Sequence, residues 1–317
     1  MSDTMASLSR KIQSAGDLQS VVRTMKTLAV SNISQYEQSV RALADYDRTV
    51  KLGLGACLRA GGPAQVEPPK QAAPGAIGAV VFGSDQGLVG RFNETVADYA
   101  VKTLAALPGT PQVWAVGERV RGHLTDAGIA VEGLLSVPQS IKAITPLVGR
   151  IQMESESHEV QGDYAHFYVF HNRPQAGALY EPVAQRLLPL DAKWRQEAAQ
   201  VSWPTKLPPE VMRLGQAPLA TLRALIREYL FISLFRACAE SLASENASRL
   251  AAMERADKNI RELLETLHGT FHRLRQSGID EELFDVVAGF DAQVESMPKG
   301  ARDDEAEQPV LFRGSRP

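Results

Sequence analysis

The sequence predicts an α/β protein that also has long α-helices, one at each end of the chain. Three observations support this prediction. Apolar residues recur at steps of three or four in both end segments, and the middle alternates short apolar runs with amphipathic stretches. Segments rich in proline and glycine separate these parts. We therefore expect an N-terminal coiled-coil helix over 1–62, a central Rossmann-like α/β domain over 75–200, a C-terminal coiled-coil helix over 215–292 and a disordered tail over 293–317.

The N-terminal helix is predicted by an apolar seam that meets no proline before Pro63. Its members are Leu8, Ile12, Ala15, Leu18, Val22, Met25, Ala29, Ile33, Tyr36, Val40 and Leu43. This spacing is typical of one seam of a coiled coil. We expect the helix to end near Gly53 and Gly55, which gives a length on the order of 70 Å at about 1.5 Å per residue.

The C-terminal helix is predicted by a second stretch without proline, from Leu219 to Met297. Its apolar positions are Ala243, Ala247, Leu250, Met253, Ile260, Leu263, Leu267, Phe271 and Leu274. Neither end segment can bury its apolar residues alone, so we expect the two seams to pack against each other.

The central domain is predicted by repeated alternation of strand and helix patterns. Strands are expected at 76–84, 112–118, 129–135 and 164–172, with helices at 93–107, 118–128 and 140–152. Asn93 is the expected N-cap of the first of these helices. Such alternation favours a mostly parallel sheet with right-handed crossovers, and 178–190 is expected to add a final antiparallel strand.

Charge and cysteine content exclude several classes of protein. The formal net charge of -3 and the pI near 6.1 do not favour nucleic-acid binding. Cys57 and Cys238 form no C-x-x-C pair, so neither a disulfide framework nor a zinc site is expected, and a reducing cytoplasm fits best. Because the chain has no long apolar run and no secretory signal, we expect contact with a membrane only through partners.

Two local patterns were weighed as chemical sites. The segment 83–90, GSDQGLVG, lies between a strand and a helix, where phosphates bind, but it has neither dinucleotide-binding nor P-loop spacing. His268 and His272 face the same way on a helix, but Gly269 stands where a zinc protease has its glutamate. A structural turn and a surface pair are the favoured interpretations. We expect no catalytic residue, no cofactor and no metal.

Four strings, in the same order along the chain, resemble one known family. The most specific is ASENASRLAAMERADKNI at 243–260, and the others are RTMKTLAVS at 23–31, SDQGLVGRFN at 84–93 and LRQSGIDEELFDVVAG at 274–289. All four are similar to segments of the gamma subunit of F-type ATP synthases. The resemblance spans about residues 5–290, and a basic stretch that usually follows the Met25 position is absent here.

The resemblance implies a non-catalytic central-stalk rotor subunit that couples ion flow to ATP synthesis or hydrolysis. In that family the terminal helices pair as an antiparallel coiled coil inside a hexameric ring of alpha and beta subunits. The α/β domain lies against an epsilon subunit and the membrane c-ring. The implied location is therefore the cytoplasmic face of the inner (plasma) membrane, as a peripheral subunit.

The resemblance also implies which residues contact partners. Met25 and Lys26 match the family's neck motif, and Arg249 matches an arginine that lies near them. Arg275 and Gln276 match a pair that contacts a loop of a catalytic subunit. Glu245 and Asn246 are supporting polar positions. Each of these residues also has a structural interpretation, as packing for Met25 and as ordinary interhelical ion pairs for Lys26 and Arg249.

Two other classes of function stay open from the sequence. The chain could be an α/β protein that binds a nucleotide or another small molecule and carries a coiled-coil arm. It could also be a passive coiled-coil scaffold. Ligand binding by residues 75–200 would favour the first class, whereas unchanged ATP turnover after substitution of Arg275 and Gln276 would favour the second.

Overall fold

A computed structural model describes residues 4–61, 76–161, 164–190, 192–206 and 217–295. The predicted linker at 62–75 and all of the predicted tail beyond residue 295 lie outside the described residues. The chain divides into two compact units, one formed by Val21–Asp257 and the other by Met1–Ser20 with Lys258–Pro317.

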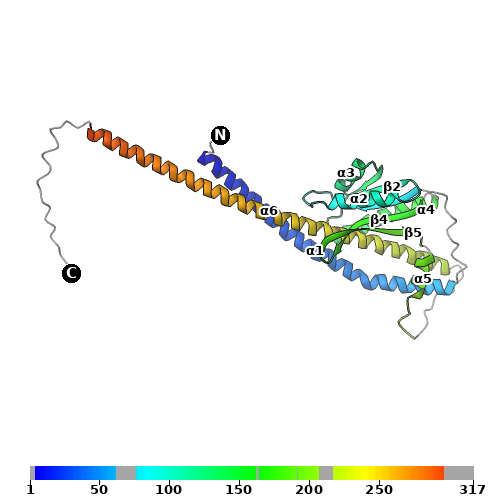
Figure 1. The fold of residues 1–317 in the computed structure, drawn as a ribbon. Helices are drawn as coiled ribbons and strands as arrows, with labels where there is room; N and C mark the ends of the chain where they lie inside the picture. The colour runs from blue at the N-terminus through cyan, green and yellow to red at the C-terminus, as the bar shows by residue number, and fades with distance from the viewer. Residues whose placement is uncertain (1–3, 62–75, 162–163, 191, 207–216, 296–317) are drawn as a thin grey trace, which may run out of the picture. The chain divides into compact units, whose positions relative to one another are not determined.

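The larger unit contains a five-stranded sheet that confirms the predicted α/β architecture (Figure 1). Its strands are β1 (Ala76–Phe82), β2 (Pro111–Val116), β3 (Val131–Leu135), β4 (Tyr164–Gln175) and β5 (Ala178–Leu188). They lie in the order β3-β2-β1-β4-β5, with β1 to β4 parallel and β5 antiparallel to β4. The predicted final antiparallel strand is therefore confirmed.

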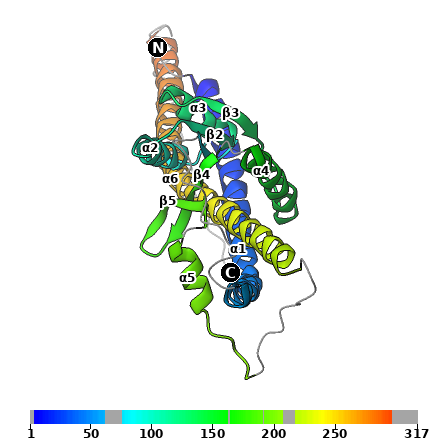
Figure 2. The same cartoon turned by 90° about the vertical axis from the view of Figure 1, so that its right-hand side faces the viewer.

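Helices cover both faces of this sheet (Figure 2). On one face, α2 (Phe92–Ala105) and α3 (Glu118–Asp126) bury an apolar core that includes Val81 and Phe170. On the other face, α4 (Ile141–Gln161) packs beside parts of the two long helices around Phe82 and Leu234. Both faces of β1 are thus buried, which agrees with its nearly continuous apolar sequence.

The two long helices are α1 (Met5–Gly61) and α6 (Ala217–Glu295), and within the larger unit they run in opposite directions. Three polar contacts establish this orientation, because the partner on α6 moves backwards as the residue on α1 moves forwards. They are Lys26 with Asp257 at 3.8 Å, Asn32 with Asn246 at 3.2 Å and Asp47 with Arg236 at 3.2 Å. The predicted antiparallel pairing is confirmed.

The buried seam of α1 is narrower than the sequence predicts. Its buried members recur every seven residues, and they are Leu8, Ala15, Val22, Ala29 and Tyr36. Leu18, which the prediction placed in the seam, is 53% exposed, so that part of the prediction is wrong. Contact with a single helix covers only a narrow strip of the α1 surface, so apolar residues beside the strip stay in solvent.

α1 also continues past the predicted end at Gly53 and Gly55 to Gly61. A short helix that the sequence did not predict, α5 (Ala192–Gln200), lies against this part of α1. A side chain at Gly55 would place its Cβ 2.5 Å from the carbonyl oxygen of Ala198. Gly55 therefore serves a close approach between two backbones and does not end the helix.

Polar contacts hold α5 against both long helices. The Arg59 guanidinium on α1 donates to the carbonyl oxygens of Ala199 at 2.6 Å and Val201 at 3.0 Å, which lie at the C-terminal end of α5. On α6, the Tyr229 hydroxyl accepts a hydrogen bond from the Trp194 indole at 3.0 Å. The helix α5 thus joins the end of α1 to the beginning of α6.

The close approach at Gly55 predicts the effect of adding a methyl group there. Gly55→Ala should lower the free energy of unfolding by about 1–2 kcal/mol, because the α5 backbone must move away. Gly16→Ala is the matched control on the same helix, since its Cβ would meet nothing within 4 Å, and it should stabilise by about 0.5–1 kcal/mol. Urea unfolding measures both, and equal stability of the two variants would contradict the role given to α5.

Candidate functional site

The first part of the most specific sequence string, residues 243–249 of the 243–260 match, lies where α1, α6 and the α/β domain meet inside the larger unit. The Ser248 hydroxyl donates to the carbonyl oxygen of Val89, in the loop that follows β1. The Asn246 amide oxygen accepts a hydrogen bond from Asn32 of α1 at 3.2 Å, and its amide nitrogen donates to the Leu242 carbonyl at 2.8 Å. This segment therefore connects α1, α6 and the α/β domain.

An ion pair between Glu245 and Arg249 is buried at the same joint. The two side chains are 8% and 13% exposed, and the guanidinium donates to the carboxylate at 2.6 Å. Burial raises the pKa of the Glu245 carboxyl above its ordinary value, and the charge of Arg249 offsets this only in part. Burial and the nearby Glu245 charge also raise the pKa of the Tyr36 hydroxyl on α1.

Asp85 lies in the 83–90 segment and contacts the start of α3, not the start of α2, the helix that follows this segment. Its carboxylate oxygens accept hydrogen bonds from the backbone N–H of Glu118 at 3.0 Å, at the start of α3, and of Val137 at 2.9 Å, beyond β3. A helix N-terminus attracts anions, and here the anion is a side chain of the same chain. The geometry therefore favours the structural interpretation of 83–90 over nucleotide binding.

Asn93 supports the same loop and is not the N-cap of α2, so that prediction is wrong. α2 begins at Phe92, and the Asn93 side chain reaches back to Ser84. Its amide oxygen accepts from the Ser84 backbone N–H and its amide nitrogen donates to the Ser84 hydroxyl, both at 2.8 Å. Asn93 supplies hydrogen-bond partners to the buried polar groups of Ser84. This tertiary requirement outweighs the local preference of asparagine for an N-cap position.

Lys26 lies next to a buried acid on α6. Its ammonium nitrogen is 3.8 Å from Asp257, which is 4% exposed, and the Arg23 guanidinium is 3.9 Å from the same carboxylate. Arg249 forms an ion pair with Glu245, about two turns before Asp257 on α6. Met25 is half-buried. The structure therefore brings Lys26 to Asp257, and Arg249 belongs to a separate pair.

Arg275 and Gln276 are exposed on α6 in the smaller unit. Large apolar side chains that stand in solvent follow them on the same helix. They are Ile279, Leu283, Phe284, Val286, Val287 and Phe290, each at least 49% exposed. Most of these positions recur three or four residues apart and so form one apolar stripe. We call these six residues the α6 stripe, which the seam-based prediction missed because it ended at Leu274.

The described residues contain no group of three or more histidine, cysteine or acidic side chains that could hold a metal ion. The rings of His268 and His272 stack at 6.5 Å between centroids on exposed turns of α6. None of the described helices combines the length and the apolar character that crossing a membrane requires.

These features define a class of protein, an α/β domain built onto an antiparallel coiled coil. A family model described as ATP synthase matches residues 4–293. Among curated relatives, the ATP synthase gamma chain of Moorella thermoacetica is 26% identical over 91% of this chain and 98% of its own. That of Paracidovorax citrulli is 26% identical over 88% of this chain and 96% of its own.

A chain in the cryo-EM structure of the Euglena gracilis mitochondrial ATP synthase, OSCP/F1/c-ring, rotational state 3, has a similar fold. The TM-score is 0.62 at 13% identity, with 94% of this chain and 97% of that chain covered. The present chain therefore belongs to the ATP synthase family, in which its relatives are gamma chains. Such a chain is a non-catalytic central-stalk subunit.

The hydrogen bonds of Asp85 predict a large loss of stability on truncation. Asp85→Ala should lower the free energy of unfolding by about 2–3 kcal/mol, because two backbone N–H groups lose their acceptor. Glu94→Ala, which removes an exposed carboxylate of α2, is the control and should have a much smaller effect. Chemical denaturation followed by circular dichroism compares them. A small loss for Asp85→Ala would show that the carboxylate does not stabilise this crevice.

The raised pKa of Glu245 predicts a pH dependence of stability. Because the folded chain binds this proton more tightly than the unfolded chain, stability contributed by the protonated carboxyl is lost as pH rises from about 4.5 through the folded pKa. Relative to the parent, Glu245→Gln should therefore become steadily more stable across that window. Urea unfolding at several pH values measures this difference. A difference that does not change with pH, or that falls as pH rises, would contradict the burial of an ionisable carboxyl.

Proposed function

We propose that this chain is the rotor shaft that couples ion flow through a membrane sector to ATP synthesis or hydrolysis on other subunits. The α6 stripe carries the proposal. Six large apolar side chains on one helix are too many to leave in water, and such a surface marks a contact with another protein. A gamma subunit of this family works inside an assembly, where partner subunits would cover this apolar surface.

The stripe and the polar residues before it suggest how the partner is contacted. Arg275 and Gln276 precede the α6 stripe directly and are themselves exposed, so a partner that buries the stripe would also meet them. An arginine can donate several hydrogen bonds to a carboxylate or to a carbonyl oxygen of a loop. We therefore assign Arg275 and Gln276 to direct contact with a loop of a catalytic subunit.

A second contact surface lies on α1 in the larger unit. Val21 and Leu28 are 55% and 58% exposed and lie on the same side of the helix as the half-buried Met25. Lys26 is beside them and keeps 28% of its side chain exposed while it faces Asp257. We assign Met25 and Lys26 to contact with the ring of subunits through this surface.

Glu245, Asn246 and Arg249 have a different role in this proposal. Their side chains are buried at the joint between α1, α6 and the α/β domain, so they face other parts of this chain. They hold the coiled coil to the α/β domain. A shaft needs this connection, because torque applied to the α/β domain must turn the coiled coil. Their contribution to coupling is therefore indirect.

The proposed partners follow from the family and from the relatives. They are the alpha and beta subunits, which form the hexameric ring, an epsilon subunit and the c-ring of the membrane sector. A gamma subunit belongs to the peripheral F1 part of a membrane ATP synthase. We place this chain at the cytoplasmic face of the inner (plasma) membrane, held there by its partners.

Coupling requires that the shaft prefer one state of the ring over another. A contact shifts an equilibrium only by the difference in its free energy between the two states. α1 and α6 contain 57 and 79 residues, so they present unequal surfaces, and a shaft of that kind cannot touch every catalytic subunit in the same way. Rotation would then change the nucleotide affinity of one site at a time.

The proposed contact of Arg275 and Gln276 predicts a defect in coupling. In a reconstituted complex, Arg275→Ala with Gln276→Ala should lower ion pumping per ATP hydrolysed several-fold while the complex still assembles, because the α6 stripe still holds the shaft. Arg273→Ala is the matched control, since Arg273 is exposed on the same turns of α6 but faces away from Arg275.

Proton pumping in vesicles and ATP hydrolysis, measured on the same preparation, give this ratio. An unchanged ratio in the double variant would fit a passive scaffold and count against the proposed contact. A stable ring of alpha and beta subunits that excludes the chain altogether would overturn the assignment of these partners.

A further inference from the structure

The α6 stripe continues into polar residues on the same side of the helix. Seven positions follow one another at steps of three or four residues, and all of them are exposed: His268, His272, Arg275, Ile279, Leu283, Val286 and Phe290. Positions at such steps lie on one face of an α-helix. We call these seven residues the 268–290 row. It begins with three side chains that can carry a positive charge and ends with four apolar side chains.

The start of α1 does not account for this row. Within the smaller unit, the covered positions of α6 also recur at steps of three or four residues. They are the buried Ile260 and the half-buried Leu264, Leu267 and Phe271. At 3.6 residues per turn, they lie roughly 90° around the helix from the polar end of the row. The seam that pairs with α1 is thus a different face, and the 268–290 row is left for another partner.

The polar end of the row is not paired with a carboxylate among the residues that the structure describes. The ion pair found on this part of α6 joins Lys258 to Glu262 at 3.9 Å, and no described ion pair includes His268, His272 or Arg275. The two imidazole rings instead stack on each other, with their centroids 6.5 Å apart. These three groups therefore remain available to a partner.

The other charged groups of the smaller unit are mostly placed away from the two histidines. Glu265 lies one turn before His268 on the same side of α6, and Arg261, one turn earlier, already has an interaction within the chain. Charged residues on other sides of α6 or about two turns beyond Arg275 are Glu262, Arg273, Asp280, Glu281 and Glu282. Those on the segment of α1 in this unit are Arg10, Lys11 and Asp17. One acid, Glu265, thus lies beside three groups that can be cationic.

The charge of this surface depends on pH. Histidine gains a proton between about pH 8 and pH 5, so the polar end of the row can carry up to three positive charges on successive turns. Like charges at this spacing on a helix repel each other, and a partner carboxylate offsets that repulsion. Carboxylates also accept hydrogen bonds from imidazolium and guanidinium groups. The row therefore fits a partner that has an acidic segment next to an apolar surface.

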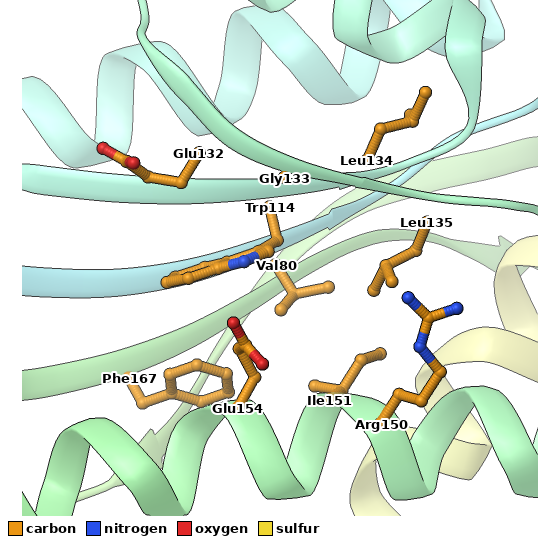
Figure 3. A pocket seen from close by; sticks show the side chains of 10 residues that line it. All are labelled: Val80, Trp114, Glu132, Gly133, Leu134, Leu135, Arg150, Ile151, Glu154 and Phe167. Carbon is orange, nitrogen blue, oxygen red and sulfur yellow. The ribbon is translucent and has the colours of Figure 1, made fainter.

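A pocket of about 180 Å³ between α4 and β3 shows the contrast with this exposed row (Figure 3). Its walls include Val80, Trp114, Glu154 and Phe167. Val80 and Phe167 are buried, and Trp114, Glu154 and Phe167 already have interactions within the chain. The fold itself uses these side chains, whereas the polar end of the 268–290 row is exposed.

We propose that His268, His272 and Arg275 bind an acidic segment of the subunit that covers the α6 stripe, and that this contact strengthens as pH falls. The protonated imidazoles add two ion pairs beside that of Arg275, and the apolar end of the row supplies binding that does not depend on pH. The added contact is gained as pH falls through the range in which imidazole takes up a proton, and it is lost as pH rises. This inference rests on the proposed function, because it needs a partner from the ring.

Exchange of the chain between complexes tests the inference. A complex of this chain with alpha and beta subunits is mixed with an excess of isotope-labelled chain, and mass spectrometry follows release of the unlabelled chain. Release should be roughly three- to tenfold slower at about pH 5.5 than at about pH 8, because two surface ion pairs are added. High salt should reduce this difference by screening. Equal release at the two pH values, or faster release at the lower one, overturns the inference.

Two double variants separate the histidines from other effects of pH on the complex. His268→Gln with His272→Gln removes both charges, so the difference between the two pH values should be lost. His268→Lys with His272→Lys is charged at both pH values, so release should be slow even at about pH 8. His123→Gln, at an exposed histidine of α3, is the control and should behave like the parent. A glutamine variant that keeps the parent's pH response overturns the inference.

Two other occupants of the polar end would give different results. The chain has an acidic sequence of its own, DDEAE at 303–307, which lies outside the described residues. If a chain that ends at Glu295 loses the pH response, the acid belongs to this chain and the inference is overturned. A metal ion held by the two histidines would slow release at high pH, and a chelator would abolish the effect, which also overturns the inference.

The outcomes separate this inference from the proposed function. If the chain does not assemble with alpha and beta subunits, the proposed function fails. If it assembles and couples, but the parent and the glutamine variant respond to pH alike, only the acidic contact at the histidines fails.

Discussion

The polar contacts between α1 and α6 are the interactions on which this structure depends. The buried seam of α1 repeats every seven residues, so apolar packing alone would discriminate poorly against a slip of α1 by seven residues. The Asn32–Asn246 hydrogen bond and the Lys26–Asp257 pair remove that freedom. A slip would remove these partners from the buried Asn246 and Asp257 side chains, which costs more free energy than a change in apolar packing.

The same segment of α6 also contacts the α/β domain, through Ser248. In open α/β sheets, ligands bind outside the carboxyl ends of the strands, where backbone N–H groups are free. Here Asp85 binds the N–H groups at the start of α3 and beyond β3, and Ser248 of α6 binds the loop that follows β1. The crevice has become an attachment point for a helix, and this use agrees with membership of a family whose gamma chains are not catalytic.

Apolar residues on the long helices serve two different purposes. Those at intervals of seven on α1, such as Val22 and Ala29, are buried within this chain. Others, such as Val21 and Leu28, are exposed, and so is the α6 stripe. A protein that works alone would rarely keep so much apolar surface in water, whereas a subunit of a larger assembly needs it for its partners.

The sequence by itself determined the order and kind of most elements, because helix and strand periodicity and glycine- or proline-rich breaks are local properties. It also identified the family, through four short strings. Only the tertiary structure decided the roles that depend on contacts between distant residues. Gly55 allows the approach of α5 and does not end α1, Asn93 binds Ser84 and does not cap α2, and Glu245 with Arg249 is buried. A periodic pattern shows that a helix has an apolar face, but it cannot show how much of that face a second helix, about 200 residues away in the chain, will cover.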